Sequence, residues 1–597
     1  MISLRRGLAM AASLIAARVL VAADTVPAAP LYLYTLSQQA DVRTYDESVA
    51  VATIQGVLNR ESPTLYVLST KFPVGLADPS RPSYWLRQFT QPGQWLANRP
   101  QKTLRSLDDL VQLAGTKLKG AVIWDPRVPA TVNVATTAAG VEDAIALSPE
   151  LAAEFLPRWK LRVIHDLRGK FTGQETGSAK NDAYRWAIRE YLAPGRCSSL
   201  FLGLYEDSYF ARANGAVDYT VNRDWMVRNR AFTFDLSPWG DEAPLDDKGQ
   251  RIGLDLETYK MILAETRRHS AGQHLTELAG FFQFTKYTNF NGVHASKHEP
   301  VPTEWETVHL ISPYNVYQNT STSDCYNQSL HSQAPRLPLK QERSARAVAY
   351  DPRKTYLCIF MADYDSACVL YDYLPKHWDD PNRGKLPLAW GINPNLLNAY
   401  PDVIAHIYRT LTPNDTITAD AGAAGYINPS RIPEDQLPLF VRHNQRYFKE
   451  AALQFAPMVL DWVAPSAAVK DAFVQFAPAG YGAMIWDMHT NTGVPPEPHV
   501  WKGMPVLNLL NQANEFPGAE KTADIIAQAI GENSGGLKGF YFFRIVWQSP
   551  SAVLDMLEHL RRKNPSLDIE VLDIHTFYAL AAQALQPPPA PAPATQR

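Results

Sequence analysis

Short apolar runs alternate with stretches of helical periodicity along the chain, most regularly beyond residue 350. There the runs recur about every 30 residues, the length of one strand–helix–loop unit. The eight runs are at 356–361, 387–391, 416–419, 457–460, 483–486, 504–508, 539–543 and 569–572. The clearest helix is 550–563, where Ser549 is a natural N-cap and Pro550 takes the first turn. This pattern predicts an α/β fold in which residues 346–585 form a C-terminal (β/α)8 TIM-barrel-like domain.

The first half of the chain carries the same two patterns at a less regular spacing. Strand-like segments occur at 31–36, 64–68, 121–124 and 161–165. Residues 46–58 have apolar positions at helical spacing, and Asp46 can cap their start. We therefore expect an N-terminal α/β domain over residues 24–170. Residues 171–345 form a middle region of one or two small domains, with a buried-strand candidate at 199–205.

Both ends of the chain differ from its body. Arg5 and Arg6 precede an apolar stretch that ends in small residues, so residues 1–23 are expected to be a signal peptide. The first cysteine after them is Cys197, which argues against a lipoprotein anchor. We therefore expect an exported protein, periplasmic or secreted and not a lipoprotein. Residues 586–597 are rich in Pro and Ala and are expected to be a disordered tail.

Composition and charge narrow the classes of function. The 57 Lys and Arg residues against 60 Asp and Glu give a net charge of −3. This balance argues against nucleic acid as a partner, since nucleic-acid-binding proteins carry a basic excess. Hydrophobic residues make up 46% of the chain, and no apolar stretch after the signal is long enough for an integral membrane segment. No phosphate-binding, dinucleotide-binding or serine-hydrolase motif is found, so we expect no cofactor.

The positions that follow the predicted barrel strands are rich in carboxylates. In a barrel of parallel strands the carboxyl ends open on one face, where active sites are built. Five of the eight runs are followed by an aspartate. The polar residues at these strand ends are Asp363, Asp365, Asn393, Asp420, Asp461, Asp487, His489, Arg544 and Asp573. A single aspartate at such a place is commonly a helix cap, but several would project into one mouth.

Several carboxylates in one mouth suit the hydrolysis of glycosidic bonds. One carboxylic acid protonates the leaving oxygen, and a second carboxylate attacks the anomeric carbon or activates water. The candidates for these catalytic roles are Asp363, Asp365, Asp420, Asp461 and Asp487. The candidates for binding the sugar are Tyr426, Asn393, Arg544, Trp390, Trp462, Trp486, Trp547 and His489. For each Trp a place in the core is an equally good interpretation.

Two other classes of function compete with this interpretation. Asp363 and Asp365 with His489 can hold a divalent cation, as hydrolytic deacetylases do, which would make the protein a metal-dependent carbohydrate deacetylase or lyase. Two carboxylates two residues apart are also a common capping pair, so we assign no metal ligand. The third interpretation is a carbohydrate-binding protein without catalysis, in which the carboxylates bond to buried donors.

Residues 420–429 read DAGAAGYINP and resemble the signature of the GxGYxYP glycoside hydrolases, a bacterial family. The positions that match the signature are Gly425, Tyr426 and Pro429. Ala423 stands where the family name has its first Gly, and Asn428 where it has its second Tyr. Other segments that look like this family lie between residues 53 and 551, so the resemblance covers nearly the whole chain after the signal.

The resemblance implies two or three small domains followed by a TIM-barrel-like domain, and a carbohydrate substrate. If the first Gly is needed for a positive φ or for close approach of a sugar, Ala423 narrows that loop. Asn428 would replace a stacking ring by an amide. The alternative is that Gly425 and Tyr426 only shape a turn that Pro429 closes. Together the residues and the resemblance favour an exported glycoside hydrolase that acts on an oligo- or polysaccharide.

Overall fold

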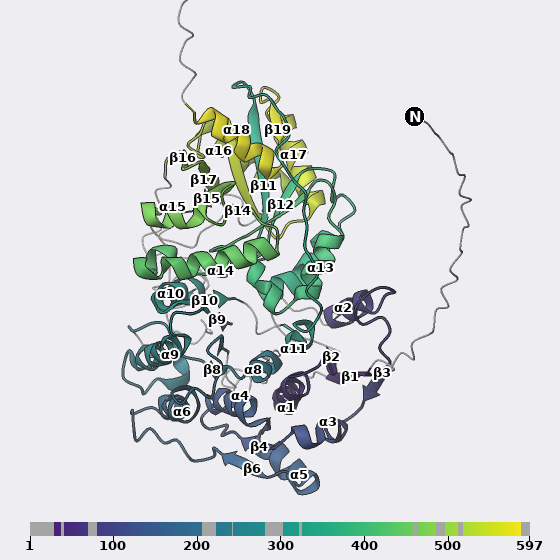
Figure 1. Ribbon diagram of the computed structural model, residues 1–597, viewed down its shortest axis with the longest axis vertical. Coiled ribbons are helices and arrows are strands. Elements are labelled where there is room, and N and C mark those ends of the chain that lie inside the picture. Colours follow the sequence, from purple (N-terminus) through teal and green to yellow (C-terminus); the bar gives the residue numbers. More distant parts are fainter. Residues whose placement is uncertain are drawn as a thin grey trace, which may run out of the picture.

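The computed structural model describes most of the chain between residues 29 and 586 (Figure 1). The described ranges are 29–36, 41–69, 80–205, 223–241, 243–280, 302–320, 325–457, 464–484, 496–510 and 517–586. The expected signal peptide and, beyond residue 586, the expected tail lie outside these ranges. Within them, no helix combines the length and the apolar character that crossing a membrane requires.

Two small parallel sheets with flanking helices form the N-terminal part. The first has the order β2-β1-β3, with β1 (Leu31–Leu36), β2 (Leu65–Ser69) and β3 (Gln101–Leu104). The second has the order β5-β4-β6, with β4 (Gly120–Ile123), β5 (Ala144–Leu147) and β6 (Val163–Asp166). The helices are α1 (Val42–Leu58), α2 (Arg81–Phe89), α3 (Leu107–Ala114), α4 (Thr131–Glu142) and α5 (Pro149–Trp159).

Helix α1 begins earlier than the sequence pattern predicts. Its N-cap is Asp41, whose Oδ1 accepts a hydrogen bond from the N–H of Thr44 at 2.7 Å. Asp46 lies inside the helix and is 2% exposed. The helix contacts β2 of the first sheet as well as β5 of the second and α8. Asp41, and not the predicted Asp46, therefore caps this helix.

The middle region contains a four-stranded parallel sheet of order β10-β9-β7-β8. Its strands are β7 (Phe201–Leu204), β8 (Phe232–Phe234), β9 (Thr276–Ala279) and β10 (Val316–Asn319). The helices of this part are α6 (Ala179–Ala187), α8 (Arg223–Asn229), α9 (Leu254–Ser270), α10 (Pro302–Ile311) and α11 (Gln328–His331). The predicted buried strand at 199–205 corresponds to β7.

The C-terminal part is a nearly closed barrel of parallel strands, which confirms the predicted TIM-barrel-like α/β class. The strand order is β13-β12-β11-β18-β17-β15-β14, so the barrel is open between β13 and β14. Its strands are β11 (Thr355–Ala362), β12 (Leu388–Gly391), β13 (Asp415–Thr418), β14 (Phe455–Ala456), β15 (Gly480–Ala483), β17 (Met504–Leu510) and β18 (Phe540–Val546). The short strand β16 (His499–Trp501) adds an antiparallel edge to β17.

The eighth predicted run forms β19 (Ile569–Val571), but it does not close the barrel. It pairs with Thr355–Leu357 at the start of β11, while β18 pairs with β11 along almost its whole length. Because β18, the seventh strand of the barrel, pairs directly with β11, the first, no eighth strand lies between these two. Asp573, which follows β19, accepts from the N–H of Thr576 and caps α18 (Ile574–Ala584).

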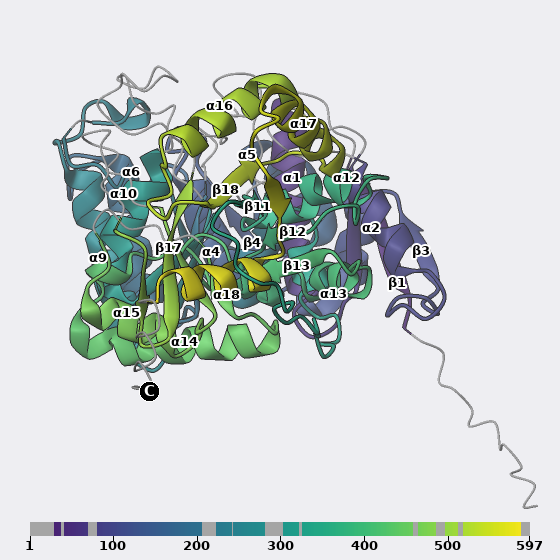
Figure 2. The same ribbon diagram turned by 90° about the horizontal axis from the view of Figure 1, so that it is seen from above.

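Helices surround the barrel, and one further helix covers its amino end (Figure 2). The surrounding helices are α12 (Leu374–Trp378), α13 (Pro401–Arg409), α14 (Leu437–Glu450), α15 (Ala467–Val474), α16 (Ala519–Gly531) and α17 (Pro550–Lys563). As predicted, Ser549 caps α17 by accepting from the N–H of Ala552 at 3.2 Å. Helix α18 lies across the amino ends of the strands, where Tyr578 packs on Phe455 and Phe542. The carboxyl ends therefore face the middle region (Figure 1).

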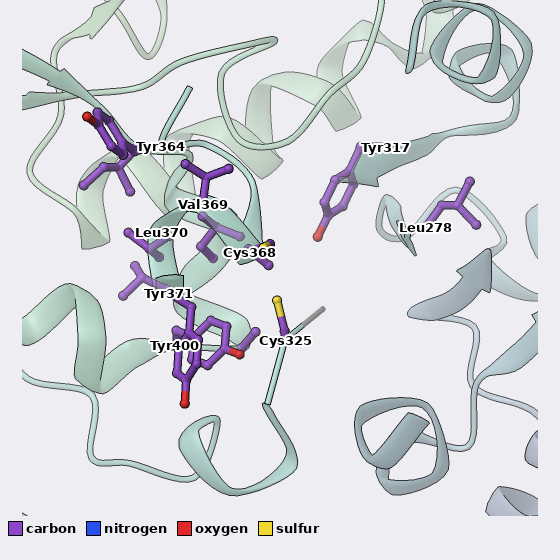
Figure 3. Packing of buried hydrophobic residues seen from close by; sticks show 14 of the residues in the cluster. Leu278, Tyr317, Cys325, Tyr364, Cys368, Val369, Leu370, Tyr371 and Tyr400 are labelled. Carbon is purple, nitrogen blue, oxygen red and sulfur yellow. The ribbon is translucent and has the colours of Figure 1, made fainter. Parts of the chain in front are cut away.

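Buried side chains join the barrel to the parts that precede it. All eight residues of β11 are buried, and they alternate between two cores. Phe360 and its neighbours of the same parity pack inside the barrel, whereas Ile359 and its neighbours pack against the helices. Figure 3 shows Tyr317 of β10 and Cys325 facing the segment after β11 that carries Tyr364 and Tyr371. The barrel mouth and the middle region thus share one packed interior.

Candidate active site

Three aspartates and one arginine meet at the carboxyl ends of the barrel strands. Asp363 and Asp365 follow β11, Asp420 follows β13, and Arg544 lies in β18 beside Phe360 of β11. One carboxylate oxygen of each aspartate lies within 4.8 Å of those of the other two. We call the three aspartates and Arg544 the acidic cluster. The structure thereby brings together three of the five predicted catalytic candidates.

The carboxylate of Asp420 is held by backbone groups of neighbouring strand ends. Its Oδ2 accepts from the N–H of Asp363 and its Oδ1 from the N–H of Ala421, both at 2.9 Å. It lies over Gly391, the last residue of β12, where a Cβ atom would come within 2.3 Å of Oδ2. Any side chain at this position would displace the carboxylate. Sequence reasoning missed Gly391, although a glycine that ends a buried strand is a known sign of close approach.

Asn393, a predicted sugar-binding residue, supports Asp420 from the end of β12. Its Oδ1 accepts from the N–H of Asp420 at 3.2 Å, and its Nδ2 donates to the carbonyl of Ala421 at 3.1 Å. The residue is 1% exposed. Both polar groups of its side chain are thus engaged with the loop that carries Asp420.

Arg544 supplies positive charge to the acidic cluster. Its guanidinium donates to Oδ1 of Asp363, and the two side chains are 8% and 25% exposed. Burial, followed by the charge of Asp363, raises the pKa of Asp365 to about 7. Burial and the charges of Asp365 and Asp363 raise the pKa of Asp420 well above its ordinary range. Since one guanidinium faces three carboxylates, two of which are buried, the acidic cluster retains a proton near neutral pH.

Two non-glycine residues at this place have left-handed backbone conformations. Asp363 has φ = 64° and Trp547, directly after β18, has φ = 49°. The Nε1 of Trp547 donates to the carbonyl of Asp363 at 2.9 Å, and its ring lies 5.2 Å from that of Tyr373. Such conformations cost about 1–2 kcal/mol per residue and are found preferentially at active sites. Trp547 is half-buried, so part of it is open to solvent beside the acidic cluster.

Trp390, predicted as a second stacking residue, lies in the core. It is completely buried, its Nε1 donates to Asp415 at 3.0 Å, and its ring lies 5.1 Å from that of Trp378. Its neighbour Gly391 faces the acidic cluster, and successive residues of a strand point to opposite faces. Trp390 therefore points toward the surrounding helices, and the structure gives it no open face on which a sugar ring could stack.

The segment 420–429 forms the loop after β13 and brings Tyr426 to the acidic cluster. The Tyr426 side chain lowers the pKa of Asp365 and so offsets part of the rise that burial causes. Ala423 has φ = 83° and Gly425 has φ = 102°. Both glycine positions of the signature therefore have a left-handed backbone, which glycine adopts freely and alanine only at a cost.

Of the remaining residues named from the sequence, Asn428 contacts the middle region and the others lie outside the described ranges. Asn428 is 1% exposed, and its N–H donates to Oγ of Ser312 in the middle region at 2.8 Å. The loops after β14 and β15 are not among the described residues. The predicted site residues that fall there are Asp461, Trp462, Trp486, Asp487 and His489. Their roles stay predictions.

The three aspartates of the acidic cluster can also hold a metal ion. Carboxylate oxygens are the ligands that hard cations such as Ca²⁺, Mg²⁺ and Mn²⁺ prefer. Oxygens within 4.8 Å of one another can contact one cation placed between them. The guanidinium of Arg544 already bonds to Asp363, however, and would repel such an ion. The donor set thus suits a hard cation less well than a cluster of carboxylates alone would.

Three models of one family match the chain. The model described as GxGYxYP putative glycoside hydrolase C-terminal domain matches residues 353–582. The GxGYxYP_N second domain matches residues 118–195, and the GxGYxYP_N 1st domain matches residues 32–113. No curated protein matches the chain.

Two solved structures match as well. A putative hydrolase from Bacteroides thetaiotaomicron VPI-5482 is 16% identical, with 94% of this chain and 96% of that chain covered and a TM-score of 0.66. This likeness shows that the two chains share a fold. A putative polysaccharide deacetylase from Mycobacterium smegmatis is 13% identical over 42% of this chain and 99% of that chain. Its TM-score of 0.28 is too low to support an argument.

The matched ranges include the first two sheets and the whole barrel with the acidic cluster at its mouth. They also include the loop 420–429, on which the resemblance in the sequence rested. The chain therefore belongs to the GxGYxYP family.

Proposed function

We propose that this protein is an exported hydrolase that cleaves glycosidic bonds of an oligo- or polysaccharide by carboxylate chemistry at the barrel mouth. The observation that carries the proposal is the acidic cluster, in which three carboxylates approach within 4.8 Å around one arginine. The family name, which reads putative glycoside hydrolase, supports the same reaction class.

The acidic cluster offers groups for both halves of the reaction. Asp363 is its most accessible aspartate, with a side chain 25% exposed, and lies against the guanidinium of Arg544. We assign it the carboxylate role toward the anomeric carbon. Asp365, whose pKa is raised to about 7 by burial and by the charge of Asp363, is the candidate for supplying the proton to the leaving oxygen. Trp547, half-buried beside Asp363, is the candidate for stacking against a sugar ring.

The spacing of the carboxylates gives a stereochemical expectation. An inverting enzyme separates its two carboxyl groups by about 6.5–9.5 Å to make room for water, whereas a retaining enzyme holds them about 5–5.5 Å apart. The oxygens of the acidic cluster lie within 4.8 Å of one another. If two of these aspartates are the catalytic pair, the product keeps its anomeric configuration, and NMR of the first-formed product reports this directly.

The experiment that tests the proposal is a product screen of the purified protein without residues 1–23 against a broad panel of glycans, with and without a chelator. Sugar release that persists in chelator is the expected result. Saturable binding of a glycan without any release would contradict hydrolysis and favour a binding protein. The Asp363→Asn and Asp420→Asn variants then show whether the release depends on the acidic cluster.

A metal-dependent hydrolase, such as a carbohydrate deacetylase, is the second candidate function. The observation that favours it is again the approach of three carboxylate oxygens, which suits a hard cation. It predicts that a divalent ion co-purifies, that chelation abolishes activity, and that the same ion restores it. Activity that is unaffected by chelator would remove this candidate.

Export is a separate part of the proposal. It is supported by Arg5 and Arg6 before an apolar stretch and by the small residues at Val21–Ala23. Cleavage there would leave Asp24 as the first residue of the mature protein. N-terminal sequencing of the protein from a periplasmic or culture-medium fraction tests this, and a cytoplasmic protein that still begins at Met1 would contradict it.

A further inference from the structure

Two half-buried aromatic rings lie next to the acidic cluster, on the side of helix α12. Nε1 of Trp547 donates to the carbonyl of Asp363 at 2.9 Å. The ring of Tyr373 lies 5.2 Å from that of Trp547, with an angle of 47° between the two planes. Among the described residues, the hydroxyl of Tyr373 has no hydrogen-bond partner. The pair therefore presents partly exposed ring surface and an unpaired hydroxyl beside the acidic cluster.

The backbone that carries each ring has an unusual conformation. Trp547 has φ = 49°, in the left-handed region. Tyr373 is the last residue of a short π-helix, Val369–Tyr373, whose earlier residues are buried in the packed interior (Figure 3). Left-handed non-glycine residues and π-helical turns both cost energy, and both occur preferentially at functional sites. Here the two features fall on one ring pair, which distinguishes this pair from aromatic residues that only fill the core.

A lysine of α12 lies over the second of these rings. Nζ of Lys376 is 4.7 Å from the centroid of the Tyr373 ring. The Lys376 side chain is exposed, and it forms no ion pair with any residue that the structure describes. A cation–π contact of this kind is weak at an exposed place. The ammonium of Lys376 therefore stays available to a negatively charged group that comes to lie on the ring pair.

These contacts connect the acidic cluster to Lys376 through the two rings. They run from Asp363 to Trp547, from Trp547 to Tyr373, and from Tyr373 to Lys376. Flat rings with polar tips suit a sugar, whose C–H groups stack on a ring while its hydroxyls bond to polar atoms. The ammonium adds attraction for an anionic substituent of that sugar. Arg544 does not compete for this role, because its guanidinium is bonded to Asp363.

We propose that Trp547, Tyr373 and Lys376 form a binding site for an acidic sugar unit, one that carries a carboxylate or a sulfate ester, next to the bond that is cleaved. This inference rests on the proposed function, because it places the unit beside Asp363. It narrows the substrate class to acidic oligo- or polysaccharides. It also makes Lys376 the residue that distinguishes an acidic chain from a neutral one.

The test is isothermal titration calorimetry of the full mature chain, carrying Asp365→Asn so that cleavage is slowed. The probes are tetragalacturonate, a sulfated galactotetraose and neutral galactotetraose. We expect one of the two acidic probes to bind more tightly than the neutral probe, and which one it is identifies the anionic group. Equal affinities for acidic and neutral probes, or no binding of either acidic probe, would overturn the proposal.

Variants of the site connect this preference to its residues. Lys376→Met keeps the aliphatic stem and removes the charge, so it should weaken binding of the acidic probe by about fivefold and leave binding of the neutral probe unchanged. Tyr373→Ala removes one ring and should weaken binding of the acidic probe by about tenfold. An unchanged affinity for the acidic probe in either variant contradicts the assignment.

Lys470→Met is the matched control, since Nζ of Lys470 also lies over an aromatic ring, 3.9 Å from the centroid of Trp501. Trp501 pairs with Met504 at the start of β17, so this contact is at the amino end of the barrel and away from the mouth. Equal losses of affinity in Lys376→Met and Lys470→Met would reflect net charge alone and would overturn the proposal.

Failure of this inference is distinct from failure of the proposed hydrolysis. Acidic binding that depends on Lys376, without cleavage of any glycan, would contradict hydrolysis and leave the binding site in place. Cleavage of neutral glycans by a protein without preference for acidic probes would do the reverse.

Discussion

Two groups of aspartates in this molecule differ in how far a neighbouring cation offsets their negative charge. In the middle region, Nζ of Lys180 lies 2.7 Å from Asp255 and 3.1 Å from Asp246, and the three side chains are 6%, 2% and 3% exposed. We call these three residues the lysine cluster. Each of its carboxylates touches the cation. In the acidic cluster the guanidinium of Arg544 bonds to Asp363. The carboxylates of Asp365 and Asp420 lie close to each other and to the carboxylate of Asp363.

This difference separates a structural arrangement from one suited to chemistry. Where every carboxylate contacts a cation, the charges offset one another and the group stabilises the packing of its elements. Where carboxylates face one another in a buried place, burial and then their mutual repulsion raise their pKa values, and a proton is retained near neutral pH. A retained proton next to an ionised carboxylate is the combination that acid–base catalysis requires. The predictions below test this contrast.

The largest effect is expected on catalysis. If Asp365 supplies the proton, Asp365→Asn lowers kcat/KM for glycan hydrolysis by about 10²–10⁴-fold, the usual contribution of a general acid. Asp255→Asn in the lysine cluster is the control, and it should retain activity as long as the protein is folded. Rates of sugar release at neutral pH measure both. Full activity in Asp365→Asn would remove this residue from the mechanism.

The second largest effect is expected on stability, and it should appear in the lysine cluster. Lys180→Met leaves two buried carboxylates without their cation, which costs about 3–5 kcal/mol in the free energy of unfolding. Asp365→Asn should cost far less, because it relieves repulsion among like charges. Denaturant unfolding of both variants measures the difference. Equal losses of stability in the two variants would mean that cations offset the negative charge of both clusters to the same extent.

The pH dependence of stability should follow from the raised pKa of Asp365. Its folded-state pKa of about 7 lies above the ordinary value of 3.8, so between these pH values the folded protein binds more protons than the unfolded chain. The stabilisation is present at low pH and is lost as the pH rises through about 7. The slope is at most about 1.4 kcal/mol per pH unit. Asp224, with a pKa raised to about 6, adds a similar trend.

The informative quantity is therefore the difference between two unfolding series. The free energy of unfolding of the unaltered protein should fall more steeply from pH 5 to pH 7 than that of Asp365→Asn, since Asp224 is common to both. Parallel curves would show that Asp365 titrates in its ordinary range.

The smallest effect concerns the glycine on which Asp420 rests. Gly391→Ala forces the Asp420 carboxylate to move, because the new Cβ would lie 2.3 Å from its Oδ2. We expect a loss of about 1–3 kcal/mol in stability, the usual cost of overpacking, together with a loss of activity. Gly531→Ala at the end of α16 meets nothing within 4 Å and is the matched control. A stable, active Gly391→Ala variant would show that Asp420 can leave its place without consequence.

The sequence located much of the site because parallel strands end on one face of a barrel. That rule alone brought Asp363, Asp365, Asp420 and Arg544 together, although they come from three strands that are distant in sequence. It could not distinguish them from Asp573, which caps α18 and pairs with Arg346. Nor could it tell Trp547 from Trp390, since one residue of shift along a strand decides which face a ring points to.

Other features depended on contacts between distant segments. The place of β19 beside the start of β11, rather than in the barrel wall, is a matter of pairing that strand length and spacing do not encode. The left-handed backbone at Ala423 was open to prediction, because the family signature has a glycine there and glycine commonly marks such a conformation.

The measurement that tests the central claim most directly is the infrared carboxyl spectrum of the unaltered protein near pH 6, compared with that of Asp365→Asn. The account predicts a protonated carboxyl band in the unaltered protein that is missing from the variant and persists in the presence of a chelator. If both proteins show the same spectrum at this pH, Asp365 is ionised there. The acidic cluster would then hold no proton on this residue to donate, and the account of the site would be contradicted.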